Sequence, residues 1–265
     1  MMSEFLSKID ASPPHWSGEL IEAWDDTLLF QHAGFLRRHH WTESGTINVF
    51  CIKGTSHPDY QGLSWLEFLH QGKHMASNLA LIESNQAYYE CYTAYYSETA
   101  AKQPAMCFNS YNGIDWYVGA DGNHRAALAR FLFHYQGKSY LHGAQLNHYE
   151  FNVPLLDVFL ALREELSLHT AQGFFMDLSV NRVHRRREDN PGWKTDIYAT
   201  SLYFSTGSWS RRYAHHPATR AVSEAREMTA PAEGLELLVA LRLWRERRMA
   251  ERNGLFSWLP GRRRA

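Results

Sequence analysis

The chain has 265 residues, 45% of them hydrophobic and 21% charged, with a formal net charge of -1, which are the values of an ordinary globular protein. Its three cysteines, Cys51, Cys91 and Cys107, are far apart and odd in number, which argues against a disulfide framework and for a reducing cytoplasm. Residues 1–14 lack the apolar core of a signal peptide, and no apolar segment approaches the roughly 20 residues of a membrane span, so we expect a cytoplasmic protein.

The charges are distributed unevenly along the chain. Up to Val180, 10 Lys and Arg stand against 19 Asp and Glu, whereas from Asn181 onward 17 stand against 9. This asymmetry predicts either contact with nucleic acid or attraction between the two parts of the chain.

The N-terminal elements can be predicted from hydrophobic periodicity. Residues 16–38 have a helical pattern that favours a helix on the outside of the main sheet. Ile47–Lys53 is β-branched and aromatic and predicts the first strand, followed by a loop over 55–61 and a short helix over 63–70. Residues 78–100 predict a long helix, whose tyrosines form a packed face or, alternatively, a platform for stacked bases.

Two strands, a glycine turn and a helix are predicted in the middle of the chain. Ala105–Ser110 and Asp115–Gly119 flank Asn112-Gly113, a strong hairpin signal. A helical period follows over His124–Tyr135, and residues 140–151 form a further strand after Gly137.

The turn between the second strand and the helix, Asp121-Gly122-Asn123-His124-Arg125, is the candidate site. A strand that ends in a glycine turn and begins a helix presents free backbone N–H groups and the positive end of the helix dipole. We expect Asn123, His124 and Arg125 to hold nucleotide phosphates, with Asp121 holding Mg²⁺ or a nucleophilic water and His124 neutralising charge on the phosphoryl group.

The C-terminal part is predicted to be basic. A helix over 153–169 precedes strands over 173–180 and 196–205, which are joined by a charged loop over 182–192, and a helix follows over 231–252. Its arginines either contact DNA phosphates or form a solvated surface. The candidate DNA contacts are Arg185, Arg186, Arg187, Arg211, Arg212, Arg242, Arg245 and Arg248.

The fifteen histidines predict no metal centre. No Cys/His group has zinc-finger spacing, and the adjacent pair His39-His40 points in opposite directions on a strand. Only His124 is assigned a role in the site.

Residues 45–152 resemble the ParB/sulfiredoxin superfamily. There the same turn carries G-E-R-R-x-R-A in partition proteins, G-G-C-H-R in sulfiredoxins and D-G-H-H-R in free-serine kinases, against D-G-N-H-R here. The absence of a cysteine in the turn argues against sulfiredoxin chemistry. The resemblance implies a mixed α+β fold over residues 1–170, with a basic region over 171–265 packed on it, and a site for ATP or another nucleoside triphosphate. It also implies a second catalytic acid after the first strand or on the helix that follows, for which Glu67 is the best-placed candidate and Asp59 the next.

The segments Asn109–Gly113, Asp121–Arg125 and Tyr140–Gly143 are similar to the plasmid fertility-inhibition factors within this superfamily. That similarity implies a bacterial cytoplasmic protein that blocks conjugative or T-DNA transfer and that has Mg²⁺-dependent ATPase and DNA-cleaving activity. Two alternatives stay open. One is a small-molecule kinase of the free-serine type, and the other is a non-catalytic inhibitor that binds a conjugation or type IV secretion component.

Overall fold

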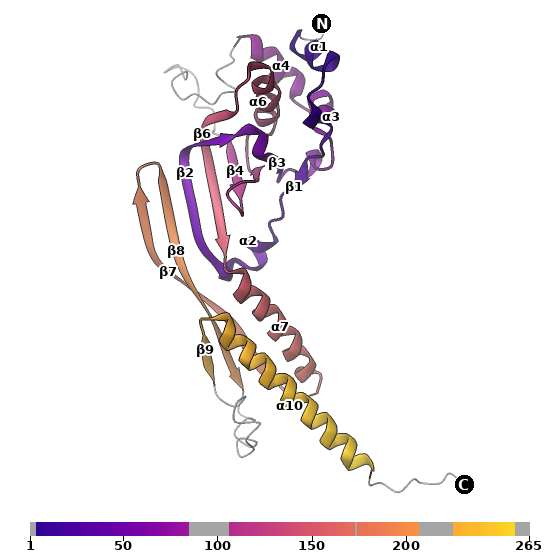
Figure 1. Cartoon of the computed structure of the whole chain (residues 1–265), viewed down its shortest axis with the longest axis vertical. Helices are drawn as coiled ribbons and strands as arrows, with labels where there is room; N and C mark the ends of the chain where they lie inside the picture. Colours follow the sequence, from indigo (N-terminus) through magenta and orange to yellow (C-terminus); the bar gives the residue numbers. More distant parts are fainter. Residues whose placement is uncertain (1–3, 85–105, 173, 207–224, 258–265) are drawn as a thin grey trace, which may run out of the picture. The chain divides into compact units, whose positions relative to one another are not determined.

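The computed structural model describes residues 4–84, 106–172, 174–206 and 225–257. The chain forms two compact units that interleave along the sequence (Figure 1). The first comprises Met1–Gln31, Arg38–Phe151 and Arg185–Ile197, and the second His32–Arg37, Asn152–His184 and Tyr198–Ala265. Helices combined with a mixed sheet confirm the predicted α+β class. Each unit takes residues from both sides of the predicted boundary at residue 170, and that boundary stays a prediction.

The first unit is built on a mixed sheet with the strand order β1-β3-β5-β4-β6-β2, followed by the tip of the β7–β8 hairpin. Strand β3 pairs in parallel with β1 and β5, and β4 pairs antiparallel with β5 and in parallel with β6. The strands are β1 (Glu22–Ala23), β2 (Leu36–Asn48), β3 (Ile52–Thr55), β4 (Cys107–Ser110), β5 (Trp116–Val118), β6 (Tyr140–Phe151), β7 (Met176–Asn190) and β8 (Trp193–Thr206). The α-helices are α1 (Glu4–Ala11), α2 (Thr27–Gln31), α3 (Trp65–Gln71), α4 (Met75–Ser84) and α6 (Asn123–Gln136).

Helix α6 lies at the centre of this unit. The nine residues Arg125–Phe133 are all buried, so the helix is enclosed on every side rather than on the one apolar face expected from its sequence. Arg130 is tolerated there because its guanidinium lies 4.4 Å from the ring centre of Trp16 and 4.1 Å from that of Trp65, and donates to the carbonyl of Ile52. Burial lowers the pKa of Arg130 to about 10.

The central predicted elements are confirmed. Strands β4 and β5 form the expected antiparallel hairpin, with Gly113 in the left-handed region at φ 72°. Helix α6 ends at Gly137, which is left-handed and donates to the carbonyls of the last turn. The predicted strand over 140–151 and the short helix over 63–70 are present as β6 and α3. Of the predicted long helix over 78–100, the structure describes only the part in α4.

The predicted helix over residues 16–38 is wrong. This segment contains 3₁₀ turns at His15–Gly18 and Ala33–Phe35, the short strand β1, helix α2 and the start of β2. Strand β1 pairs with β3 at Gly54, where a side chain would meet the carbonyl oxygen of Glu22 at 1.9 Å. Because Gly54 has no side chain, residues 22–23 can approach β3 closely enough to pair with it. This tertiary pairing overrides the helical periodicity of the segment.

The other N-terminal prediction needs correction as well. Ile47–Lys53 is not one strand, because β2 ends at Asn48 and β3 begins at Ile52. Between them, Val49–Cys51 forms a 3₁₀ turn in which the Asn48 side chain accepts from the N–H of Phe50 at 3.0 Å. The asparagine side chain thus competes locally with the strand hydrogen bonds. A similar 3₁₀ turn, Pro58–Tyr60, lies within the predicted loop over 55–61.

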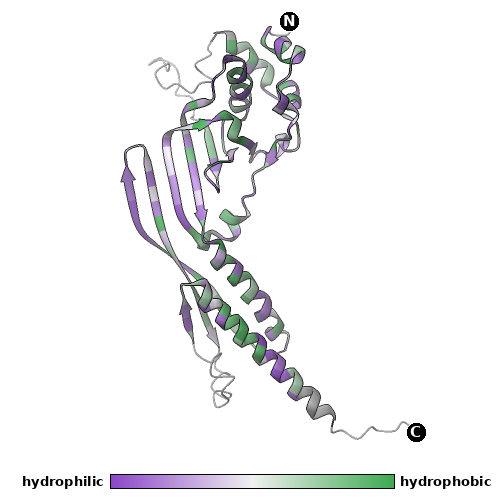
Figure 2. Cartoon of the chain, viewed as in Figure 1, coloured by the Kyte–Doolittle hydropathy of each residue, from purple (hydrophilic) through white to green (hydrophobic). Residues whose placement is uncertain are grey.

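The predicted charged loop over residues 182–192 is a third correction, because most of it is strand. β7 runs from Met176 to Asn190 and β8 from Trp193 to Thr206, so only a short turn around Gly192 joins them. Figure 2 shows β7 as hydrophilic over most of its length. The strand is exposed, so its charged side chains remain in water. Its sequence is therefore as polar as that of a loop and was predicted as one.

The second unit contains α7 (Val153–Thr170), α10 (Pro231–Ser257) and β9 (Arg226–Met228), which pairs antiparallel with β8. The predicted helices over 153–169 and 231–252 are confirmed by α7 and α10. Leu237, Leu241 and Trp244 of α10 are buried. None of the described helices is long and apolar enough to cross a membrane.

Candidate functional site

The turn at Asp121–Arg125 is braced by strand β4. The N–H of Cys107 donates to the carbonyl of Asp121 at 3.1 Å, and the carbonyl of Cys107 accepts from Gly119 at 2.8 Å. Gly122 is the N-cap of α6 at φ 112°, and a side chain there would meet Met106 at 2.7 Å. Only glycine therefore fits this position, and both ends of the turn are held in place.

The first backbone N–H groups of α6 lie where the sequence predicts phosphate binding, and that role stays a prediction. No side chain caps the helix, and within the described part of the chain no hydrogen bond is formed by the N–H groups of Asn123 and His124. The side chain of Asn123 instead accepts from Thr55 Oγ1, which also accepts from the N–H of His57. The end of β3 is thereby fastened to the start of α6.

Arg125 differs from its predicted role as an exposed phosphate clamp. It is only 4% exposed, and its Nη2 donates to Asp121 Oδ2 at 2.9 Å. The Asp121 side chain is 45% exposed. Arg125 is therefore placed to position the carboxylate of Asp121, one turn earlier on the same side of the helix.

Asp121 has one carboxylate oxygen bonded to Arg125, while among the described residues no hydrogen bond engages Oδ1. A single accessible carboxylate fits Mg²⁺ that arrives with the phosphates of a nucleotide, because Mg²⁺ keeps several waters and needs few protein ligands. It does not fit a metal cage made by the protein alone.

Three histidines surround the start of α6. The ring of His124 lies 5.7 Å from that of His74 and 5.4 Å from Tyr60, on which His57 is stacked at 4.4 Å. Burial, with His74 and His57 adding to it, lowers the pKa of His124. The neutral imidazole is therefore favoured near neutral pH, which suits proton transfer better than the charge neutralisation expected from the sequence.

Glu67, the predicted second acid, has a structural role at the start of α3. Its Oε2 accepts from the backbone N–H and the hydroxyl of Ser64 at 2.7 and 2.8 Å, and Ser64 Oγ accepts from the N–H of Glu67 at 3.1 Å. These hydrogen bonds form a capping box and lower the pKa of the Glu67 carboxyl group. Its catalytic role stays a prediction.

The predicted DNA-contacting arginines are engaged to different degrees. On β7, Arg187 makes a bidentate pair with Asp196 at 2.7 and 2.9 Å, and Arg186 pairs with Glu188 at 2.7 Å. Arg185 is exposed. Arg211 and Arg212 lie outside the described residues. Only part of the predicted set on β7 is thus available to a phosphate without loss of an internal bond.

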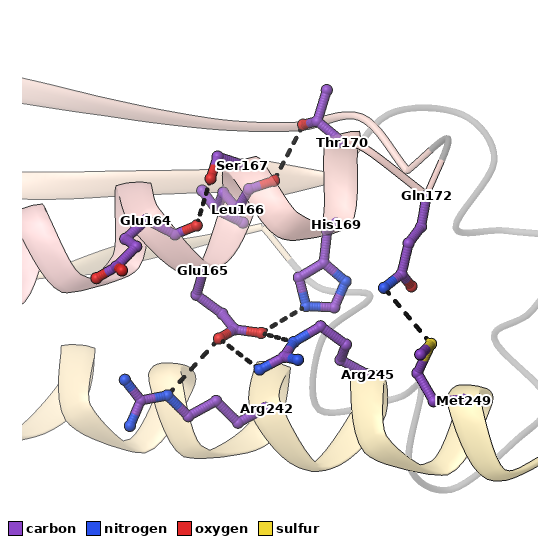
Figure 3. A network of polar contacts seen from close by, with 10 residues as sticks. All are labelled: Glu164, Glu165, Leu166, Ser167, His169, Thr170, Gln172, Arg242, Arg245 and Met249. Atoms are coloured by element: carbon purple, nitrogen blue, oxygen red, sulfur yellow. Dashed lines mark hydrogen bonds and ion pairs between the residues drawn. The ribbon is translucent and has the colours of Figure 1, made fainter.

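In the second unit, two more of these arginines bind the buried Glu165 (Figure 3). Arg245 Nε donates to Glu165 Oε1 at 2.6 Å and its Nη2 to Oε2 at 3.2 Å, while Arg242 Nε lies 3.7 Å from Oε2. The third, Arg248, has its guanidinium 4.0 Å from the ring centre of Phe174. These arginines of α10 therefore take part in its packing on α7.

A further group of potential metal ligands was missed from the sequence. His40, His148 and Glu150 lie on the neighbouring strands β2 and β6, with ligand atoms within 4.8 Å of one another. The spacing His148-x-Glu150 could have indicated it, because alternate residues on a strand share one face. The third ligand lies about a hundred residues earlier in the chain and carries no local signal.

Comparisons of the chain with protein-family models, with characterised proteins and with solved structures give no match. Fold and site define an α+β protein with a strand, glycine turn and helix that present an aspartate and a helix N-terminus. The resemblance to the ParB/sulfiredoxin superfamily rests on the sequence motif.

Proposed function

We propose that this protein is a nucleotide-hydrolysing, DNA-directed enzyme of the ParB/sulfiredoxin type that acts as a fertility-inhibition factor. The observation that carries the proposal is the junction at Gly122, where the accessible carboxylate of Asp121 stands beside the uncapped start of α6. This junction combines the two things that phosphoryl transfer needs, namely donors for phosphate oxygens and a group that can hold Mg²⁺ or orient water.

The chain's own residues would divide the chemistry as follows. The N–H groups of Asn123 and His124, at the positive end of α6, would bind the phosphate oxygens. Asp121 would hold Mg²⁺ through Oδ1, and Arg125 would fix its orientation through Oδ2. His124, neutral at physiological pH, would take or give a proton. The ion would supply charge neutralisation on the phosphates when bound.

The test is turnover of ATP and cleavage of supercoiled plasmid DNA with Mg²⁺ by the full chain. We expect Asp121→Asn to lower turnover by about 10²-fold or more, since it removes the only carboxylate of the turn. Arg125→Lys should lower it by a comparable factor by misplacing Asp121. Glu43→Gln, an exposed carboxylate on β2, is the matched control. Absent turnover in the wild type, or full turnover in Asp121→Asn, would contradict the proposal.

DNA binding is tested separately by fluorescence anisotropy at several salt concentrations. The exposed Arg185 is expected to contact phosphate, so Arg185→Ala should weaken binding and reduce the salt slope by about 1. Arg187→Ala should change the slope less, because this arginine is bonded to Asp196. An unchanged slope in Arg185→Ala would exclude β7 from the DNA interface.

A second candidate, a non-catalytic inhibitor that binds a conjugation or type IV secretion component, is favoured by the burial of Arg125. With this guanidinium inside, the turn offers phosphate only neutral donors. Inhibition of plasmid transfer in a mating assay separates the two candidates. Loss of inhibition in Asp121→Asn supports the enzyme, and full inhibition supports the binding protein.

A further inference from the structure

The face of the sheet that carries His40, His148 and Glu150 is distinct from the Asp121 turn. His40 Nε2 lies 2.9 Å from Glu150 Oε1, and the two imidazole rings stack with centres 5.3 Å apart and planes at 21°. All three side chains are half-buried, with 26% of His40 and 31% of Glu150 exposed. An ion could therefore reach this group from solvent.

The His40 imidazole is oriented through the ring nitrogen that does not face Glu150. His40 Nδ1 is 3.0 Å from the hydroxyl of Thr195, a residue that is only 7% exposed. His148 forms a hydrogen bond with the backbone of Tyr111. Metal-binding histidines are held in this way, because an oxygen at one nitrogen fixes the tautomer and directs the lone pair of the other to the ion.

Glu150 completes a set of two nitrogen ligands and one oxygen ligand. Arg38 Nη1 lies 3.5 Å from its Oε2, so the carboxylate is restrained from two directions. Two imidazoles and one carboxylate suit zinc and the other first-row divalent metals rather than Mg²⁺ or Ca²⁺, which prefer oxygen ligands. Three protein ligands leave a coordination position for water.

We propose that His40, His148 and Glu150 bind one divalent transition-metal ion of the zinc or iron(II) class, with an open position. The ligand atoms lie within 4.8 Å of one another, with His40 Nε2 and Glu150 Oε1 2.9 Å apart, and would be spaced about 3.3 Å apart around a tetrahedral ion, a change that side-chain rotation can supply. The site is independent of the phosphate chemistry proposed for Asp121.

The experiment is titration of the metal-free full chain, without an affinity tag, with Co²⁺, followed by displacement with Zn²⁺. We expect one equivalent of Co²⁺ to produce the d–d absorption bands of a Co²⁺ ion with low coordination number. Displacement of Co²⁺ by Zn²⁺ should remove these bands. His148→Gln and Glu150→Gln should each weaken binding by at least about 100-fold. His39→Gln is the matched control, because His39 is next to His40 and bonded to Asn147 at 3.1 Å outside the group.

Thr195→Val provides a finer test of the same site. It leaves the three ligands in place and removes the partner of His40 Nδ1, so affinity should fall about 10-fold without loss of stoichiometry. Circular dichroism and thermal unfolding of each variant show that it is folded. Absence of the Co²⁺ bands in the wild type, or equal binding by folded His148→Gln and wild type, would overturn the proposal.

Discussion

Each compact unit holds a glutamate between a histidine and an arginine, but the two clusters have different surroundings. Glu165 in the second unit is 3% exposed and accepts a bidentate pair from Arg245, with Arg242 and His169 also within 4 Å. Glu150 in the first unit is 31% exposed and has a long contact to Arg38 and a short one to His40. The same residue types thus form a closed ion-pair cluster in one unit and an accessible group in the other.

The difference teaches how burial and donor number separate a structural cluster from a binding site. Around Glu165, Arg245 and Arg242 contact both oxygens of the carboxylate, which is buried (Figure 3). Removal of one partner there leaves an uncompensated buried charge. Around Glu150, Nδ1 of His40 contacts the Thr195 hydroxyl while Nε2 of His40 lies beside the half-buried carboxylate. That arrangement can accept an ion with little rearrangement.

The largest expected effect is therefore on Glu165. Glu165→Ala leaves Arg245 without its acceptor and removes the carboxylate that lies 3.3 Å from His169, and should lower the free energy of unfolding by about 3 kcal/mol. The measurement is urea or guanidinium unfolding at neutral pH. Glu164→Ala, one residue earlier and exposed, is the control and should change stability by less than about 0.5 kcal/mol. Equal effects of the two substitutions on stability would show that the ion pairs of Glu165 do not stabilise the protein.

The two arginines of this cluster should differ from each other. Arg245 makes two hydrogen bonds to Glu165 and its side chain is 28% exposed. The Arg242 side chain is 53% exposed, and its Nε lies 3.7 Å from Glu165 Oε2. We expect Arg245→Ala to cost about 2 kcal/mol and Arg242→Ala less than about 1 kcal/mol, again by denaturant unfolding. If Arg242→Ala proved the more damaging, the bidentate pair would not be what holds α10 on α7.

The next largest expected effect is a change of the free energy of unfolding with pH. His169 is fully buried, stacked on Trp244 at 4.9 Å, and burial lowers its pKa below the value of about 6.5 in the unfolded chain. Below that pH the unfolded chain binds the proton more readily, so stability should fall from pH 7 to 5 by at most about 1.4 kcal/mol per unit from this group.

His169→Phe keeps an aromatic ring against Trp244 and removes the titration. The slope of unfolding free energy against pH should therefore become shallower in this variant, although Glu165 and Arg245 still face the position. His39, His124 and His148, whose pKa values are also lowered by burial, would contribute to the remaining slope. An unchanged slope would show that His169 does not titrate in this range.

The elements that could be predicted from the sequence are those specified locally. The Gly122 turn, the Asn112-Gly113 hairpin and helix α10 each carry their glycine or periodic signal within a few residues. The C-terminal part of β7 was predicted as a loop because its side chains are charged on both faces, and β1 was missed because its pairing depends on Gly54, about 30 residues away. A helical period alone could not show that long-range contact.

In the candidate site, too, the features specified locally could be predicted and the tertiary contacts could not. The sequence predicted the position of Asp121 and the uncapped start of α6, but not that Arg125 would lie inside and bind Asp121. It did not predict the His40 group either, because the pairing of β2 with β6 brings together residues over a hundred positions apart. A residue's partner, unlike its helix or turn, is fixed by tertiary structure.

The smallest expected effect tests the accessible cluster itself. In metal-free protein, Glu150→Gln should change the free energy of unfolding by less than about 1 kcal/mol, because the pair with His40 is half-exposed and screened by solvent. With Zn²⁺ at about 100 times its dissociation constant, the wild type should gain about 2.7 kcal/mol and Glu150→Gln should gain far less. The contrast with Glu165→Ala is then complete, since one carboxylate stabilises the protein alone and the other only through an ion. A large loss in the metal-free variant would instead make Glu150 a structural residue like Glu165.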